Sequence, residues 1–408
     1  MYSSKYQKTL VILLSLSWGF VFLDRQAITY IMPMLVEEFG MNMAEVGSIT
    51  MWCSLAFAFS GIIFGVIADR TGYRKRILIP FLFLGAIFSG LTAVSSTIFM
   101  LIVIRFLVGF FEGPVYPLQT TMMQLQTDPK RFAINVGYIS MGGVIFAAII
   151  GPVMVTQLAY WFNWHLAFII TATPAFIVAL IIAFYAKEVD RKQVLASRDE
   201  KASTWSQFTE LIKYRNFVIC LILQLFVMSA SWAGIAYQSV YWVQLGGFTQ
   251  EQFGLFMTIY GVIGICYNLF APRIADKFGR RPTCAGLFFL FIIPYILMYF
   301  SASIPVFIVF LILGPIQTFL IQLIQGIIGN ESIPAHLRST NTSILMGVGE
   351  FLGAAIIVRI LGSLADAFGL PSVFLVAAIA SLIGGLISLA LKETNPNKKV
   401  PSEQSVAA

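Results

Sequence analysis

The organisation of this chain is decided by a short stretch, GVIADRTGYRKR at residues 65–76, and by a second copy of it, ADKFGRRP at residues 275–282. Each copy holds an aspartate, a basic residue directly after it, a glycine two residues further on and then a pair of basic residues. Each copy also follows the second long apolar run of its half of the chain. A match at equivalent places indicates two halves that are built alike.

The composition excludes a water-soluble protein. Of the 408 residues, 58% are hydrophobic and 11% are charged, whereas soluble domains have about 25% charged residues. The lipid bilayer must therefore be the solvent. The net charge of +7 is typical of basic cytoplasmic loops, and we expect no nucleic-acid partner. The four cysteines lie in or beside apolar runs without paired spacing, which predicts neither a disulfide framework nor a metal site.

Twelve apolar runs are long enough to cross a membrane, since a helix that spans about 30 Å of hydrocarbon needs about 20 residues. The runs are residues 9–31, 44–68, 77–96, 98–122, 132–158, 163–186, 217–243, 251–272, 283–301, 304–328, 339–363 and 371–391. They lack the period-2 alternation of barrel strands, so we expect helices. The first run continues past Asp24 without a small-residue cleavage site, which favours a retained helix over a signal peptide.

The basic residues predict the orientation. Of the 26 lysines and arginines, three lie inside the runs, namely Arg25, Arg105 and Arg359. The others all fall in the two tails or in loops that follow even-numbered runs. This distribution places both termini in the cytoplasm and requires an even number of spans. Short loops and compact tails are typical of a bacterial inner-membrane protein.

The longest polar stretch lies between the sixth and seventh runs and is interpreted as a cytoplasmic linker. Two halves of six spans related by a parallel repeat describe a carrier of the major facilitator type, and we expect it to act as a monomer. The predicted parts are a first half at residues 1–186, the linker at 187–216, a second half at 217–392 and a cytoplasmic tail at 393–408.

The repeated stretch is predicted to be a gating motif. Gly65 and Gly72 would permit close helix approach and a tight turn. Asp69 could accept from a helix N-terminus or from an arginine of a neighbouring span, and so lock the cytoplasmic side in one state. An ordinary basic loop is the alternative. The residues assigned to the motif are Gly65, Asp69, Arg70, Gly72, Arg74, Asp276, Gly279 and Arg280.

Charged side chains within a span are costly and indicate function by default. The embedded residues are Asp24, Arg25, Arg105, Glu112, Glu350 and Arg359. Glu350 and Arg359 are too far apart along one helix for a direct pair, and Arg359 could simply pair with Asp366. For these two residues a structural role is the equal alternative.

One face of the fourth span is polar. It carries Arg105, Gly109, Glu112, Tyr116 and Gln119, which follow one another in steps of four and three. Because such a face cannot point at lipid, we expect it to face the first span across a cavity. Asp24 would then pair with Arg105, and Arg25 with Glu112. The alternative is an ion-pair network without a role in transport.

Two stretches resemble a known family. FLDRQAI at residues 22–28 resembles the Asp-Arg element of the anion:cation symporters of the major facilitator superfamily, which include sialic acid, galactonate and hexuronate carriers. RFLVGFFEGPVYP at residues 105–117 resembles the fourth span of that family, and DPKR at residues 128–131 and the later Gly151-Pro152 also fit. The superfamily resemblance covers the whole chain, whereas the family resemblance rests on spans 1, 4 and 5.

The resemblance implies proton-coupled symport of a small organic anion, a sugar acid or carboxylate, by alternating access. It implies that Arg25 binds the anionic group and that Asp24 and Glu112 carry protons, with Arg105 tuning them. The proton is the coupling ion, and no cofactor is expected. Further candidates for contact with the substrate are Tyr116, Gln119, Trp232, Tyr237 and Gln317. Interhelical hydrogen bonding is the alternative for these side chains.

Several features depart from the family. The seventh span lacks the additional cation of some relatives, and Trp164-His165 stands where Trp-Arg is common. Spinster-like lipid carriers also have an Asp-Arg element and an acid in the fourth span. A proton-driven exporter of lipids or drugs is therefore the alternative function. Gly142-Gly143 with Gly151-Pro152 resembles the motif of antiporters, although its trailing glycines are missing.

A membrane enzyme or a channel is the third alternative, and a channel would show uncoupled, non-saturating flux. The two histidines, His165 and His336, lie near span ends and form no metal-ligand cluster with the cysteines. The sequence has neither a nucleophile–base motif nor a phosphate-binding loop, so we expect neither catalysis nor ATP-driven transport.

Overall fold

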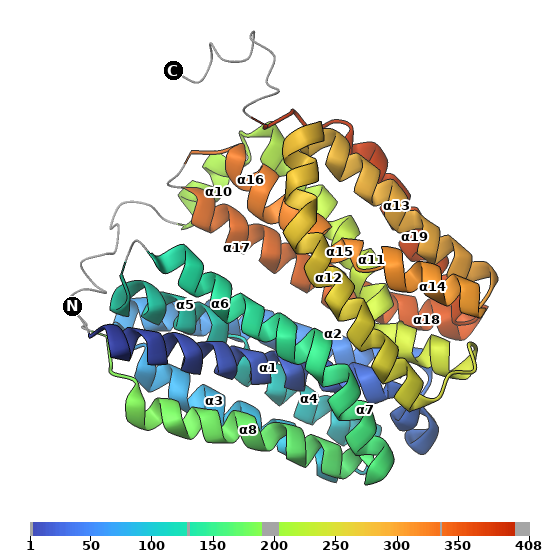
Figure 1. Ribbon diagram of the computed structural model, residues 1–408, viewed down its shortest axis with the longest axis horizontal. Coiled ribbons are helices and arrows are strands. Elements are labelled where there is room, and N and C mark those ends of the chain that lie inside the picture. The colour runs from blue at the N-terminus through green and yellow to red at the C-terminus, as the bar shows by residue number, and fades with distance from the viewer. Residues whose placement is uncertain (1–2, 129–130, 190–203, 335–336, 396–408) are drawn as a thin grey trace. The chain divides into compact units, whose positions relative to one another are not determined.

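The structure, a computed structural model, describes residues 3–128, 131–189, 204–334 and 337–395. Every regular element in this part of the chain is a helix (Figure 1). Twelve helices, some of them interrupted, are long and apolar enough to cross a membrane. The predicted all-α fold with twelve spans is confirmed.

The spans of the first half are formed by eight α-helices, one π-helical segment and the short 3-10 helix η1 (Thr92–Val94), which ends the third span. They are α1 (Ser4–Phe39), α2 (Met43–Thr71), α3 (Lys75–Leu91), α4 (Ile98–Glu112) with α5 (Val115–Gln126), α6 (Phe132–Val144) with η3 (Ile145–Ile150) and α7 (Gly151–Trp161), and α8 (Trp164–Tyr185). The fourth span is interrupted at Gly113-Pro114, because proline cannot donate a main-chain hydrogen bond.

The short helix α10 (Thr204–Leu211) precedes the spans of the second half. These are α11 (Arg215–Gln244), α12 (Gln250–Phe278), α13 (Arg280–Phe300), α14 (Ile304–Leu313) with α15 (Ile316–Gln322), η4 (Leu323–Ile328) and α16 (Gly329–Glu331), α17 (Arg338–Val348) with η6 (Gly349–Ile357) and α18 (Val358–Phe368), and α19 (Pro371–Ser388).

The helices extend past the apolar runs because polar caps hold their ends. At the start of α1, the main-chain N–H of Tyr6 donates to Ser3 Oγ at 3.3 Å. Its last turn ends at Gly40, whose φ of +61° is a conformation that glycine adopts readily. Asn42 and Glu45 form a capping box at the start of α2.

The chain groups into two compact units. The first comprises residues 1–200 and 242–261, and the second comprises residues 201–241 and 262–408. The end of α11 and the beginning of α12 therefore belong to the first unit. Within that unit α1 packs on α6, α2 on α4, and α3 on α8. Within the second unit the largest helix contact is between α13 and α19.

Glycines bring the helices of the first unit close together. A Cβ atom on Gly109 of α4 would lie 2.1 Å from the main-chain oxygen of Cys53 on α2, and one on Gly142 of α6 would lie 2.3 Å from that of Ser15 on α1. No other residue fits at either crossing without displacement of backbone. The glycines that resemble an antiporter motif thus have a packing role between α1 and α6.

Segment η3 interrupts the fifth span with π-helical turns, which leave main-chain carbonyls available to other helices. Tyr30 Oη of α1 donates to the oxygen of Ala147 at 2.6 Å, and Thr258 Oγ1 of α12 donates to that of Ile149 at 2.7 Å. These bonds tie the start of α12 and the far end of α1 to the same segment.

The crossing of α2 and α4 supplies a test of stability. We expect Gly109→Ala to lower the unfolding free energy by about 1–3 kcal/mol, because overpacking forces backbone apart. Thermal unfolding of the purified protein in detergent would measure it. Gly137→Ala on α6 is the matched control, since a Cβ there meets no atom within 4 Å. Equal stability of the two variants would contradict the assigned contact.

Candidate functional site

Four charged side chains lie together inside the first unit. Asp24 and Arg25 on α1 are 2% and 7% exposed, and Arg105 and Glu112 on α4 are 1% and 2% exposed. The Glu112 carboxyl lies within electrostatic reach of Asp24, Arg25 and Arg105. Two acids and two bases can neutralise one another, which is the condition for burying them in hydrocarbon.

The predicted neighbours Asp24 and Arg105 meet, but through the main chain. Arg105 Nη1 donates to the main-chain oxygen of Asp24 at 3.2 Å. Asp24 Oδ1 has no hydrogen-bond partner in the described part of the chain, and neither have Arg105 Nε and Nη2. The contact therefore positions the arginine and leaves the carboxyl oxygen of Asp24 available.

Aromatic rings hold the two arginines. The Arg25 guanidinium lies 4.2 Å from the ring centre of Phe57 on α2, and its Nη2 donates to Ser54 Oγ at 3.4 Å. The Arg105 guanidinium lies 4.9 Å from the ring centre of Phe168 on α8. A ring face stabilises a cation without neutralising it. The aromatic contacts therefore leave the positive charge of each arginine in place.

A small cavity connects the two carboxyl groups. Asp24, Ser17 and Glu112 line it, and its volume of ≈ 10 Å³ is about what one water molecule needs. Glu112 Oε2 is buried without a hydrogen-bond partner among the described residues. Unpaired buried polar atoms are costly. A partner that enters the cavity would therefore stabilise these atoms.

The polar face of the fourth span continues along α5. Gln119 Nε2 donates to Ser17 Oγ of α1 at 3.0 Å, so this face lies against the first span. Tyr116 Oη and Ser140 Oγ of α6 share a hydrogen bond of 2.9 Å. Gln119 Oε1 is buried and lacks a partner in the described chain. Of these two candidates, Gln119 therefore has an acceptor atom to offer.

The remaining candidates belong to the second unit. Trp232, Gln317 and Glu350 are buried. Tyr237 is buried as well, and its hydroxyl donates to the main-chain oxygen of Val358 at 2.7 Å. This bond favours the interhelical role for Tyr237. Arg359 Nη1 donates to Ser363 Oγ, one turn along α18, at 2.5 Å.

The first copy of the gating motif lies where α2 ends and α3 begins. Gly72 ends α2 with a φ of +77°, so the predicted tight turn is present. The close approach predicted at Gly65 is wrong for this structure, because a Cβ there would meet open space. Arg70 is exposed and Arg74 is buried. The side chain of Asp69 lies outside the described residues.

A carboxylate that the sequence analysis missed caps α3. Glu188 accepts from the main-chain N–H groups of Arg74 and Lys75, each at 2.9 Å, and of Arg76 at 3.0 Å. These groups begin a helix and have no partner within it. A negative charge at this end also interacts favourably with the helix dipole.

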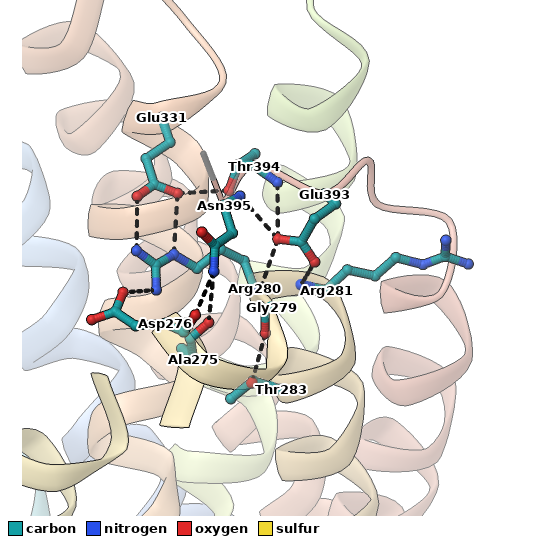
Figure 2. A network of polar contacts seen from close by, with 10 residues as sticks. All are labelled: Ala275, Asp276, Gly279, Arg280, Arg281, Thr283, Glu331, Glu393, Thr394 and Asn395. Carbon is teal, nitrogen blue, oxygen red and sulfur yellow. Dashed lines mark hydrogen bonds and ion pairs between the residues drawn. The ribbon is translucent and has the colours of Figure 1, made fainter. Parts of the chain in front are cut away.

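The second copy repeats this arrangement (Figure 2). Glu393 accepts from the main-chain N–H groups of Arg280 at 2.7 Å and Arg281 at 3.2 Å. Gly279 has a φ of +106°, and a Cβ there would lie 2.5 Å from Glu393 Oε2. The glycine of the motif is thus required by the carboxylate that caps α13.

Arg280 adds ion pairs to the second copy. Its Nη1 lies 2.5 Å from Asp276 Oδ1, and its Nη2 lies 3.1 Å from Glu331 Oε1 (Figure 2). Asn395 Nδ2 donates to the main-chain oxygen of Asp276 at 2.7 Å. The motif is therefore tied both to the end of the tenth span and to residues that follow the twelfth.

The signal for these caps is present in the sequence. Lys187-Glu188 follows the sixth span, and Lys392-Glu393 follows the twelfth. A lysine–glutamate pair at equivalent places is a second internal repeat. This repeat is too short to be informative alone. In the structure, the glutamate of each pair caps the helix that follows the motif.

The profile described as Major Facilitator Superfamily matches residues 14–357. The chain belongs to the Major Facilitator Superfamily. It is 23% identical to the hexuronate transporter of Escherichia coli (strain K12) over 97% of this chain and 96% of that protein. It is also 28% identical to the multidrug resistance protein MdtG of Dickeya zeae (strain Ech586), over 96% and 97% of the two chains.

The fold is similar to that of a solved structure. A bacterial homologue of the human lysosomal transporter Spinster, in an inward-facing and occupied conformation, superposes with a TM-score of 0.81 and 16% identity over 95% of this chain and 97% of that chain. The chain described here, as a member of the Major Facilitator Superfamily with twelve spans, is a multi-pass membrane transporter and not an enzyme.

The two caps supply a test of the motif. We expect Glu188→Ala and Glu393→Ala each to lower the unfolding free energy by about 1–3 kcal/mol, since charge-assisted hydrogen bonds to helix N–H groups are lost. Thermal unfolding in detergent would measure the change. Glutamine keeps one acceptor oxygen, so Glu188→Gln and Glu393→Gln should fall between alanine and wild type. No loss with alanine would contradict the capping role.

Proposed function

We propose that this transporter carries a small organic anion, a sugar acid or another carboxylate, together with a proton. The observation that supports it is the buried set of Asp24, Arg25, Arg105 and Glu112 with its unpaired polar atoms. The similarity to a hexuronate transporter supports the class of substrate.

Charge balance supplies the mechanism. The four side chains are close to neutral as a group, and an anion that enters adds one negative charge. A net charge is costly in a low-dielectric interior. Protonation of one carboxyl group restores neutrality, so anion and proton enter together. Arg25 attracts the anion. When Arg25 turns from a carboxylate to the anion, that carboxylate loses a neighbouring positive charge and becomes a better proton acceptor.

The roles follow from the contacts. Arg25, held by Phe57 and Ser54, would bind the anionic group. Asp24 and Glu112 would carry protons across the small cavity that both line. Arg105 would tune them from its place on the main chain of Asp24.

Other candidates would complete the site. Gln119 would offer its free oxygen to a substrate hydroxyl, and Tyr116 would assist. In the second half, Trp232 and Gln317 would contribute contacts and Tyr237 would support them. Glu350 and Arg359 would be further groups of the site. The two copies of the gating motif would control alternating access. Both termini would lie in the cytoplasm of a bacterial cell, and the monomer would be the working unit.

A proton-driven exporter of lipids or drugs is the second candidate. It is supported by the 28% identity to a multidrug resistance protein. The glycines of α6 are a weaker argument for it, because they serve the contact with α1.

The first test uses liposomes that contain a pH dye and are held at zero membrane potential. We expect an added sugar acid or carboxylate to acidify the interior in wild type, since the proton moves inward with the anion. Arg25→Ala should reduce the rate at least tenfold, and Arg25→Lys should rescue it only in part because lysine lacks the planar fork. If no small acid causes proton movement, but lysolipids or lipophilic cations bind, the symporter is contradicted and the exporter is favoured.

A second test separates proton coupling from binding. Glu112→Gln should bind the substrate within about threefold of wild type but lose at least tenfold in acidification, since the amide cannot take up a proton. Isothermal titration calorimetry and the pH dye measure the two quantities. Uptake by wild type should rise as the external pH falls, because the proton is a co-substrate. Coupling unchanged in Glu112→Gln would remove this residue from the proton path.

A further inference from the structure

A second, larger cavity lies in the first unit at the end of α1 far from the N-terminus. Its volume is ≈ 440 Å³, within the range of small-molecule sites, about 300–1,000 Å³. Six residues line it, from α1, the end of α11 and the start of α12: Pro33, Met34, Glu37, Val243, Gln244 and Gln250. None of them takes part in the transport chemistry proposed above.

Gln250 is one of the lining residues, and one of its side-chain atoms is unsatisfied within the described part of the chain. Its Nε2 donates to the main-chain oxygen of Tyr30, which fixes the carboxamide plane. Its Oε1 has no hydrogen-bond partner among the described residues, although Gln250 is buried, with 8% of its surface exposed. An unsatisfied buried carbonyl oxygen is destabilising. A ligand with an N–H donor would satisfy this oxygen.

Glu37 gives the cavity a negative charge. Its carboxylate is exposed and forms no ion pair within the described chain. Glu38, Glu45 and Glu251 lie near the same ends of the helices, where the connecting loops have neither lysine nor arginine. The field of these acids favours a cation over an anion.

We propose that this cavity binds a small primary amine as its ammonium ion. The ammonium would donate to Glu37 and to Gln250 Oε1 as charge-assisted hydrogen bonds. Its alkyl part would lie against Pro33, Met34 and Val243. A metal ion fits less well, since one carboxylate cannot supply the six to eight oxygen ligands that Ca²⁺ takes. A quaternary amine has no N–H for Gln250.

The ammonium group could come from a free amine or from the ethanolamine headgroup of a phospholipid. Both present the same three N–H donors, and the apolar wall suits either carbon chain. The site is independent of the transported substrate, so it does not rest on the proposed symport.

The test is isothermal titration of the full-length protein, in detergent free of phospholipid, with n-butylammonium chloride at 0.15 M salt. We expect saturable binding that is at least tenfold weaker for tetramethylammonium and for neutral n-butanol. Glu37→Gln and Gln250→Leu should each weaken binding at least tenfold. Glu251→Gln, which lies outside the cavity lining, should change it less than twofold because salt screens distant charges.

To identify the source of the amine, n-butylammonium binding is compared between nanodiscs of two different lipids. If the headgroup fills the site, n-butylammonium should bind at least tenfold more weakly in discs of phosphatidylethanolamine than in discs of phosphatidylcholine; equal binding assigns the site to free amines. The proposal is overturned by absent binding to wild type, by equal binding of tetramethylammonium, or by wild-type affinity in Glu37→Gln. Glu37 is exposed, so this variant tests the site even if Gln250→Leu fails to fold.

Discussion

The constraint on which this structure depends is the burial of two acids and two arginines between the first and fourth spans. Hydrocarbon offers such groups no solvation, so every stabilising contact must come from the protein. Phe57 and Phe168 receive the guanidinium groups, and the main chain of α1 accepts from Arg105. The contact of α2 with α4 at Gly109 is close enough for Ser54 and Phe57 of α2 to reach the same region.

In the mechanism proposed above, this arrangement separates the positioning of Arg105 from proton transfer. Arg105 is held by a main-chain oxygen, which does not titrate, while carboxyl oxygens of Asp24 and Glu112 remain without hydrogen-bond partners in the described chain. A group that must gain and lose a proton is better served by a neighbour whose own contacts do not depend on that proton. The aromatic contacts of the arginines have the same property.

The two copies of the gating motif share the same helix cap but differ in their ion pairs within the described part of the chain. In each, a glutamate that follows the last span of the half caps the helix after the motif. The second copy adds ion pairs from Arg280 to Asp276 and Glu331. The two compact units do not coincide with the two halves of the chain, because residues 242–261 pack with the first unit. That exchange creates the cavity lined by Glu37 and Gln250.

The sequence by itself determined the twelve spans and the polar face of the fourth span. Hydrophobic length and helical periodicity depend only on residues near one another in the chain, so these features can be read directly. Only the tertiary structure decided which atoms meet. Arg105 bonds the backbone of Asp24, Glu188 caps a helix 114 residues away, and Gln250 reaches Tyr30 across 220 residues. Such contacts depend on rotamers and on how distant helices pack, which periodicity does not specify. For the same reason the close approach predicted at Gly65 is absent, and the π-helical segment that accepts from Tyr30 was not predicted.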